Sequence, residues 1–217
     1  MGYSSVASVN LGPARTLEQK PLLVSAIDKV PVHDPVLVGA SSLHGDEVGD
    51  PRNHGGTYRA LYAHALEDLE WWGRELGRGL RPGFFGENLT TRDLDLNSCV
   101  VGEQWLVGTA RLQVSSVRIP GETFSRWMGL SGFDAAGWRR RFVERGRPGV
   151  FLSVLDEGWV VGGDPIGVID RPDHGLTAAA MFRALTTEPA LLPLLLEVDG
   201  LPAEAYEEAQ AYVDRHG

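Results

Sequence analysis

Residues 149–172, GVFLSVLDEGWVVGGDPIGVIDRP, decide the fold. The stretch contains three short apolar segments rich in Val and Ile, with Gly, Asp and Pro residues between them. Short β-branched segments that are bounded by turn residues are typical of β-strands. We therefore expect three short strands in this stretch.

The same pattern of short strands runs through most of the first two thirds of the chain. In residues 110–117, ARLQVSSV, Leu112 and Val114 face one way while Gln113 and Ser115 face the other. Because closing a sheet removes its exposed edges, many short strands with Gly-rich turns predict a closed or sandwiched β structure. The other segments predicted as strands are 5–11, 22–30, 35–40 and 103–108.

Helical patterns interrupt these strands. One long helix is predicted from Thr57 to Leu76, directly after the sequence HGG, because Leu61, Leu69 and Trp72 recur near helical spacing. A shorter pair of helices is predicted within residues 123–146, where aromatic residues recur every four to five positions.

The predicted secondary structure changes after Arg171. From there the strand pattern stops, and three helices are predicted to begin near Thr177, Pro189 and Pro202. The fold class expected is mainly β with α (α+β). We expect one β-barrel-like domain with inserted helices, followed by a small three-helix domain; the two domains would cover residues 1–171 and 172–217.

Composition narrows the classes of function. Apolar residues make up 43% of the 217 residues, and the formal net charge is −9, so nucleic acid is not an expected partner. The single cysteine, Cys99, rules out an intramolecular disulfide and argues against a cysteine zinc site. The longest apolar run, residues 190–196, is far shorter than a membrane span. No secretory signal pattern precedes the first strand, so we expect a cytoplasmic protein.

Residues 44–50, HGDEVGD, form the first candidate site. Three carboxylates beside a histidine can bind a hard cation or act as acid and base. The structural alternative is a solvated turn, because Gly and Asp strongly favour turns.

Residues 52–61, RNHGGTYRAL, form the second candidate site. Gly55 and Gly56 allow close approach of a ligand to the backbone, and the N-terminus of the predicted helix favours an anion. His54 and Arg59 would add positive charge on the same side. The alternative is a tight loop with a surface His and surface Arg residues.

Residues 84–91, FFGENLTT, form the third candidate site. Asn88 and Thr90 offer neutral hydrogen-bonding groups for a polar ligand, and Glu87 could transfer a proton. The structural alternative is that these side chains satisfy the backbone of a turn between strands.

The fourth candidate site is residues 117–124, VRIPGETF, at the end of a predicted strand. Pro120 fixes the backbone there, and the guanidinium of Arg118 is suited to binding an anion. The alternative is a strand end with a solvated arginine.

Taken in order, these motifs resemble the MOSC domain family, in its bacterial stand-alone form with a C-terminal three-helix segment. The resemblance covers almost the whole chain and implies a β-barrel-like domain. It also implies the molybdenum cofactor (molybdopterin), a pterin with a phosphate tail and a dithiolene that holds the metal. Relatives of this subtype reduce N-hydroxylated compounds, and others transfer sulfur to the cofactor. The resemblance is carried by residues 45–72, 85–91, 100–120 and 149–172.

The resemblance also implies which residues line an anion-binding cleft. We predict catalytic roles for His54, Glu87 and Arg118. The residues predicted to bind the cofactor are Gly55, Gly56, Arg59, Asn88, Thr90, Arg118 and Gly121.

Position 121 departs from the family pattern of Arg, any residue, Pro and Cys, in which the cysteine is the thiolate ligand of molybdenum. This chain keeps Arg118 and Pro120 but has Gly121, which provides no donor atom. Cys99 is interpreted as a packing residue, so no metal ligand is predicted.

Three functions stay open at this point. The first is a molybdenum-cofactor-related reductase of N-hydroxylated compounds. The second is a molybdenum-independent enzyme that uses the cleft for a small polar metabolite and binds no cofactor. The third is a non-catalytic module that binds or carries the cofactor. The expected partners are a small-molecule ligand, a redox partner protein and a second copy in a homodimer, with no membrane contact.

Overall fold

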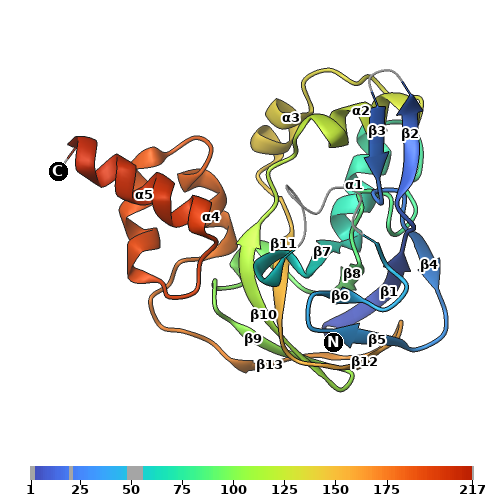
Figure 1. The fold of residues 1–217 in the computed structure, drawn as a ribbon, viewed down its shortest axis with the longest axis horizontal. Coiled ribbons are helices and arrows are strands. Elements are labelled where there is room, and N and C mark those ends of the chain that lie inside the picture. Colours follow the sequence, from blue (N-terminus) through green and yellow to red (C-terminus); the bar gives the residue numbers. More distant parts are fainter. Residues whose placement is uncertain (1–2, 20–21, 48–55, 217) are drawn as a thin grey trace.

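The computed structural model describes residues 3–19, 22–47 and 56–216. An eight-stranded sheet forms the centre of the molecule (Figure 1). Its neighbouring strands are antiparallel, except for one parallel pair. In spatial order the strands are β13 (Ile166–Asp170), β9 (Gln104–Val107), β10 (Ala110–Val117), β11 (Val150–Asp156), β7 (Leu61–Ala65), β8 (Leu89–Arg92), β1 (Ser5–Leu11) and β4 (Val30–Val32), with β7 and β8 parallel.

Two smaller sheets flank the large one. The first has the strand order β12 (Gly158–Val160), β5 (Val36–Gly39) and β6 (Ser42–Leu43). The second is a hairpin of β2 (Arg15–Gln19) and β3 (Leu22–Ser25). The predicted strand at 22–30 is therefore divided, because β3 ends at Ser25 and β4 begins at Val30.

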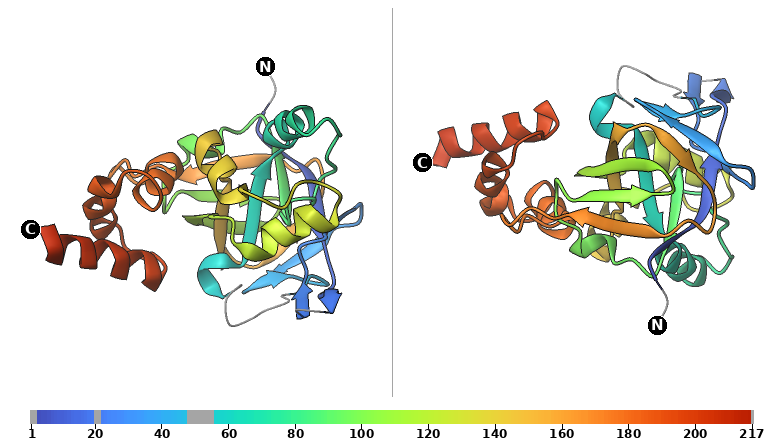
Figure 2. Two further views of the ribbon diagram at one scale, coloured as in Figure 1. Left: turned by 90° about the horizontal axis from the view of Figure 1, so that it is seen from above. Right: turned by 90° about the horizontal axis from the view of Figure 1, so that it is seen from below.

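Backbone hydrogen bonds close the large sheet on itself. The Val6 amide donates to the Asp164 carbonyl at 2.9 Å, and the Gly163 amide donates to the Val6 carbonyl at 2.7 Å. A third bond, from the Ile166 amide to the Ser4 carbonyl at 2.8 Å, joins the start of β13 to the chain before β1. The strands curve around a common core in both views of Figure 2. This closure confirms the predicted barrel-like architecture.

The alternation predicted along β10 is confirmed where it faces the core. Leu112 and Val114 are fully buried, and they pack with Trp105 and Leu152 inside the ring of strands. Ser115 is buried as well, because the pairing register of β10 with β11 shifts between Val114 and Ser116. Both faces of β10 are therefore covered at the end that leads to residue 118.

The predicted helix from Thr57 to Leu76 is wrong in its first half. Residues Leu61–Ala65 form β7, and helix α1 covers only Leu66–Glu75. Every residue of β7 is buried, and its backbone pairs with β11 on one side and β8 on the other. Pairing on both sides outweighs the weak local preference for helix. The HGG sequence therefore precedes a single 3₁₀ turn, η1 (Thr57–Arg59), and not the N-terminus of a long helix.

A second hydrophobic core lies under the helices. The predicted helical pair is confirmed as α2 (Glu122–Leu130) and α3 (Trp138–Arg145). Together with α1 these helices enclose a group of buried aromatic rings, which we call the aromatic cluster. Within it, the Phe85 and Phe124 rings meet edge to face at a centroid distance of 5.1 Å. The members of the aromatic cluster are Trp72, Phe85, Phe124, Trp138 and Phe142.

The C-terminal segment, residues 172–217, begins its helices where the sequence predicts. Thr177 caps α4 (Ala178–Ala184), and its hydroxyl accepts a hydrogen bond from the Ala180 amide at 3.1 Å. The next two helices are η3 (Pro189–Glu197), which is a 3₁₀ helix, and α5 (Ala203–His216). Met181 and Phe182 pack into the same hydrophobic cluster as the barrel core, so apolar contact is continuous across residue 171. No helix of the described residues is long and apolar enough to cross a membrane.

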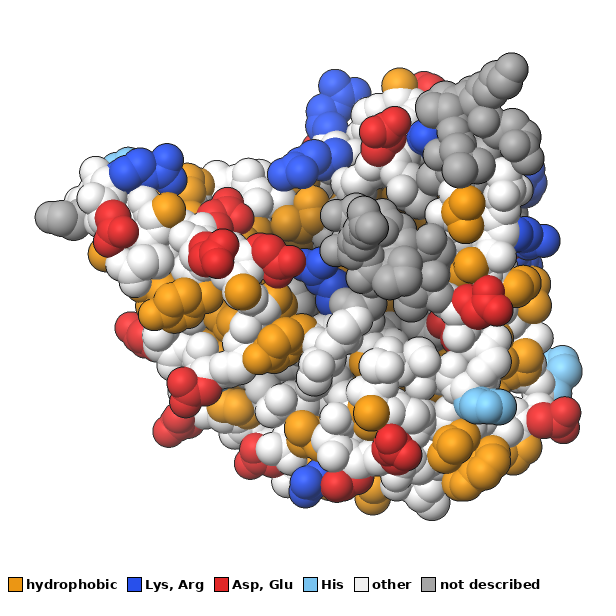
Figure 3. Space-filling view, viewed as in Figure 1, with side chains coloured by type: hydrophobic (Ala, Val, Ile, Leu, Met, Phe, Trp, Pro, Cys, Tyr) orange, Lys and Arg blue, Asp and Glu red, His pale blue; other side chains and the backbone are white. Residues whose placement is uncertain are grey.

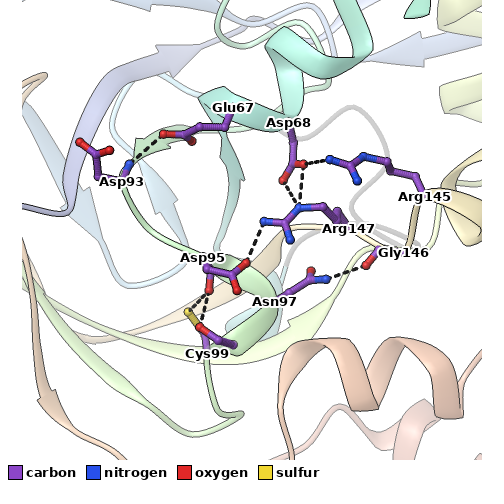
Figure 4. A network of polar contacts seen from close by, with 10 residues as sticks. Glu67, Asp68, Asp93, Asp95, Asn97, Cys99, Arg145, Gly146 and Arg147 are labelled. Carbon is purple, nitrogen blue, oxygen red and sulfur yellow. Dashed lines mark hydrogen bonds and ion pairs between the residues drawn. The ribbon is translucent and has the colours of Figure 1, made fainter. Parts of the chain in front are cut away.

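A network of ion pairs ties three elements together (Figure 4). The carboxylate of Asp68, on α1, is 2.7 Å from Arg147 Nε and 2.9 Å from Arg145 Nη2. Arg147 also reaches Asp95, just before the 3₁₀ turn η2 (Leu96–Ser98), at 2.8 Å. Burial raises the pKa of Asp68, and the two arginines oppose that shift.

Replacing Asp68 should destabilise the fold strongly. Asp68→Ala leaves the guanidinium groups of Arg145 and Arg147 without their shared carboxylate. Because each arginine side chain keeps about a quarter of its surface exposed, we expect the lower end of the cost of a broken buried pair, about 3 kcal/mol. Urea unfolding followed by circular dichroism measures this change.

The matched control is Asp156→Ala, which removes an exposed carboxylate 2.8 Å from Arg111. Exposed pairs of this kind contribute about 0–1 kcal/mol. If Asp68→Ala lowered the free energy of unfolding no more than Asp156→Ala does, the network would not hold these elements together.

Candidate functional site

A cavity of about 840 Å³ lies between the barrel and the C-terminal segment, and we call it the central cavity. Its walls come from the loop after β3, from η1 and β7, from the end of β10 and the start of α2, and from α5. Figure 3 shows a hollow in the surface between these two parts of the molecule. The volume is in the range of small-molecule and cofactor sites.

The central cavity brings together four of the predicted site residues. These residues come from η1, from the turn before β8 and from the end of β10. Glu87 and Thr90 are fully buried and do not line the cavity. Gly56 is exposed to solvent and is not part of the lining either. His54 and Gly55 lie outside the described residues. The four residues in the lining are Arg59, Asn88, Arg118 and Gly121.

Arg118 stands in the cavity wall, just after β10, with its guanidinium held in place. One of its nitrogens donates a hydrogen bond to the Phe85 carbonyl. The guanidinium carbon lies 4.8 Å from the centre of the Tyr62 ring and 5.0 Å from that of Phe124. Among the described residues, no carboxylate forms an ion pair with Arg118. Its remaining N–H groups are therefore suited to binding an anionic group of a ligand.

Gly121 opens directly onto the central cavity. It is the N-terminal cap of α2 and has an extended backbone, with φ −102° and ψ −165°. A Cβ atom built at this position meets no atom of the described residues within 4 Å, its two chain neighbours aside. The backbone therefore does not require glycine here, and the space that a side chain would occupy is open.

Glu87 lies behind the cavity wall, where its carboxylate holds a turn. It accepts hydrogen bonds from the Gly83 amide at 2.5 Å, the Phe85 amide at 3.0 Å and the Thr90 hydroxyl at 3.0 Å. Burial raises the pKa of Glu87, and these hydrogen bonds oppose the shift. The geometry favours the structural alternative for Glu87 and Thr90, and a catalytic role for Glu87 has no contact to support it.

The floor of the cavity holds an ion pair that the sequence analysis missed. Lys29 Nζ lies 2.5 Å and 2.6 Å from the two carboxylate oxygens of Asp46. Asp46 also accepts hydrogen bonds from the side-chain amide of Asn88 and the backbone amide of Gly12, both at 2.8 Å. Burial lowers the pKa of Lys29, and the neighbouring Asp46 opposes that shift.

These contacts give Asp46 a structural role. Its carboxylate neutralises a buried lysine, and with only 7% of its side chain exposed it does not lie in a solvated turn. The signal in the sequence was a lysine within the apolar segment 22–30, which we interpreted as a continuous strand. Within the described ranges, no group of three or more His, Cys, Asp or Glu residues is placed to hold a metal ion.

Cys99 is remote from the cavity lining. It is buried in the main hydrophobic core at the end of η2, with its sulfur 3.7 Å from the Asp95 carbonyl. Burial raises the pKa of this thiol to about 12, so it is protonated at neutral pH. The described lining of the central cavity contains no cysteine or methionine. It therefore offers cations for an anionic group and no sulfur ligand for a metal.

Comparison with known proteins identifies the same fold and family. The model of the MOSC domain matches residues 50–167. The uncharacterised protein YflK of Bacillus subtilis is 29% identical over 174 residues, which is 80% of this chain and 76% of YflK. The protein YiiM of Escherichia coli is 30% identical over 151 residues, 68% of this chain and 65% of that protein.

Two further relatives bear on structure and function. The crystal structure of YiiM from Geobacillus stearothermophilus superimposes with a TM-score of 0.78 at 26% identity, covering 97% of this chain and 99% of that one. A protein of Gibberella moniliformis that is named Reductase is 28% identical over 186 residues. The match covers 83% of this chain but only 32% of that protein.

A cysteine introduced at Gly121 should be accepted by the fold and reach the cavity. We expect Gly121→Cys to change the free energy of unfolding by no more than about 0.5 kcal/mol, because its Cβ meets open space. In the native state, Ellman's reagent should react rapidly with the new thiol and not with the buried Cys99.

The matched control is Gly158→Cys, since a Cβ at Gly158 would lie 2.4 Å from the Thr109 carbonyl carbon. That variant should be strongly destabilised and expose Cys99. The opposite outcome is a folded Gly121→Cys protein in which the new thiol reacts no faster than Cys99. In that case a side chain at position 121 would not face the open cavity.

Proposed function

This chain belongs to the MOSC domain family, and from that premise we propose that it is a molybdenum-cofactor-related reductase of small N-hydroxylated compounds. The observation that carries the proposal is Arg118, an oriented cation in the wall of the central cavity that has no carboxylate partner among the described residues. The fungal relative named Reductase supports the class of reaction. The substrate follows from the resemblance of the sequence motifs alone.

The cavity lining fits the phosphate of the pterin cofactor better than it fits the metal. Arg118 would hold the anionic phosphate of the pterin, and Arg59 would add positive charge from η1. When bound, the cofactor would supply the electron-transfer chemistry. The protein's own contribution is to orient an anionic group and to enclose it against apolar walls such as Phe124 and Phe151. No described residue in the lining provides the thiolate that the family pattern places at position 121.

A specific observation favours a second candidate, a molybdenum-independent enzyme that acts on a small polar metabolite. The open space beside Gly121 gives a ligand access to the point where a metal-bound side chain would otherwise stand. A small anionic metabolite could then use Arg118 directly, with no cofactor between them. A non-catalytic carrier of the cofactor would need the same contacts without a substrate.

The reductase proposal requires an electron donor. A cytoplasmic redox partner protein would supply the electrons. A second copy of this chain in a homodimer would not supply them. Both partners are predictions from the sequence.

Metal and pterin analysis tests the proposal. Protein purified from a host that makes the cofactor should contain molybdenum, and should release a pterin that fluoresces after oxidation. We expect Arg118→Ala to lower the affinity for the cofactor by about ten- to a hundredfold, because a lost charge-assisted hydrogen bond costs about 1.5–3 kcal/mol.

The control for this experiment is Arg111→Ala, which removes an exposed arginine of β10, the strand that precedes Arg118, where it is paired with Asp156. It should keep the wild-type content of both molybdenum and pterin. If the wild-type protein carries neither, the reductase proposal is overturned and the molybdenum-independent enzyme takes its place. If Arg118→Ala unfolds the protein, Arg118→Lys tests the same contact, because lysine keeps the charge but loses the planar fork.

A further inference from the structure

The central cavity is lined by charges of both signs, and the acidic ones are in excess. Its described lining contains three basic residues, Lys29, Arg59 and Arg118, and five acidic residues. Such a lining does not suit a ligand that is anionic throughout, because like charges would face each other across a partly desolvated space. The five acidic residues are Asp46, Glu47, Glu122, Glu204 and Glu208.

Two of the five carboxylates come from the C-terminal segment. Glu204 and Glu208 are separated by one helical turn on α5, so they lie on the same face of that helix. The buried residues Ala205 and Ala209 fix the rotation of α5 by packing into the hydrophobic core. Figure 3 shows acidic side chains along the edge of the C-terminal segment that faces the barrel.

The carboxylates on α5 differ from those on the cavity floor. Asp46 is neutralised by Lys29 at 2.5 Å, and Glu47 accepts a hydrogen bond from the Ala14 amide at 2.8 Å. Glu204 has only a loose contact with Arg59, at 3.6 Å, and its side chain is 73% exposed. Among the described residues, Glu208 has no ion-pair partner. The wall formed by α5 therefore presents negative charge that the described residues neutralise only at Glu204, and there only loosely.

The cation of the cavity comes from the barrel side. Arg118 follows β10 and precedes α2, and it too lacks a carboxylate partner in the described part of the chain. Among the described residues, one cavity thus combines a barrel guanidinium that has no carboxylate partner with two α5 carboxylates, of which Glu204 is loosely paired and Glu208 is unpaired. A ligand can satisfy both only if it carries an anionic group and a cationic or N–H-rich group.

We propose that Glu204 and Glu208 determine the charge specificity of the central cavity, and that they select a small ligand with a cationic nitrogen group. The inference rests on the proposed function, since it takes the same cavity as the ligand site. The anionic group of the ligand or cofactor binds at Arg118, and the cationic group of the substrate binds against α5. The family model ends at residue 167, so this selectivity is supplied by a part of the chain that the family match does not cover.

Small aromatic probes that differ only in charge test the proposal. Benzylamine and benzoate are titrated into the full-length protein, with binding followed by ligand-detected NMR. In the double variant Glu204→Gln/Glu208→Gln, we expect the affinity for benzylamine to fall by about two- to fivefold per carboxylate, the range for partly exposed charge pairs. The affinity for benzoate should stay the same or rise. Arg118→Ala should show the opposite pattern.

The matched control is Glu207→Gln, which removes the same charge from an exposed position of α5 outside the cavity lining. It should leave both affinities unchanged. Equal losses of benzylamine binding in Glu207→Gln and in the double variant would overturn the inference, because they would reflect general surface charge. So would an unchanged benzylamine affinity in the double variant.

The same titrations separate this inference from the proposed function. If benzoate binds in an Arg118-dependent manner but benzylamine does not respond to the α5 variants, only the specificity inference fails. If neither probe binds the wild-type protein, the central cavity is not a ligand site and both proposals fail together.

Discussion

One buried carboxyl group holds the turn that carries part of the cavity wall. Glu87 has no exposed surface, and three donors, the Gly83 and Phe85 amides and the Thr90 hydroxyl, point at its carboxyl group. The side-chain amide of Asn10 adds two more bonds, to the Glu87 carbonyl at 3.2 Å and to the Thr90 hydroxyl at 3.0 Å, and so ties β1 to the same turn. The turn then directs the Phe85 carbonyl toward Arg118, the Phe85 ring into the aromatic cluster, and the side chain of Asn88 toward Asp46. The hydrogen-bonding groups that the sequence FFGENLTT seemed to offer to a ligand are thus used mainly to build the site.

The arrangement of charges gives an acidic protein one cavity cation that is suited to an anion. Each cation in the cavity lining is in a different state: Lys29 is neutralised by Asp46, Arg59 is loosely paired, and Arg118 has no carboxylate partner among the described residues. Net charge alone gives no information about these differences, since it counts the three equally. Aromatic rings beneath the Arg118 guanidinium fix its direction while leaving its edge available, which is a combination suited to planar or phosphate-bearing anions.

Much of the fold follows from local sequence signals, and the failures have clear physical causes. Turn residues between short Val- and Ile-rich segments predicted most of the strands, and the cap at Thr177 and the prolines at 189 and 202 predicted the starts of the last three helices. The segment Leu61–Ala65 was mispredicted because its neighbours β8 and β11, which are distant in sequence, decide its conformation. Arg118 and Gly121 could be found from the sequence because one motif carries both. Lys29, Glu204 and Glu208 could not, because only the tertiary structure brings the loop after β3 and helix α5 to the same cavity.

The bonds that close the barrel also order its assembly during synthesis. Val6 is bonded to Gly163 and Asp164, so the ring of strands cannot close until residue 164 has left the ribosome. Until then β1 can pair with β8 and, over Val9–Leu11, with β4, but its edge at Val6 waits for a partner more than 150 residues away. The C-terminal segment follows the barrel strands in the chain, so the cavity between these two parts forms only after the last barrel strand has been made.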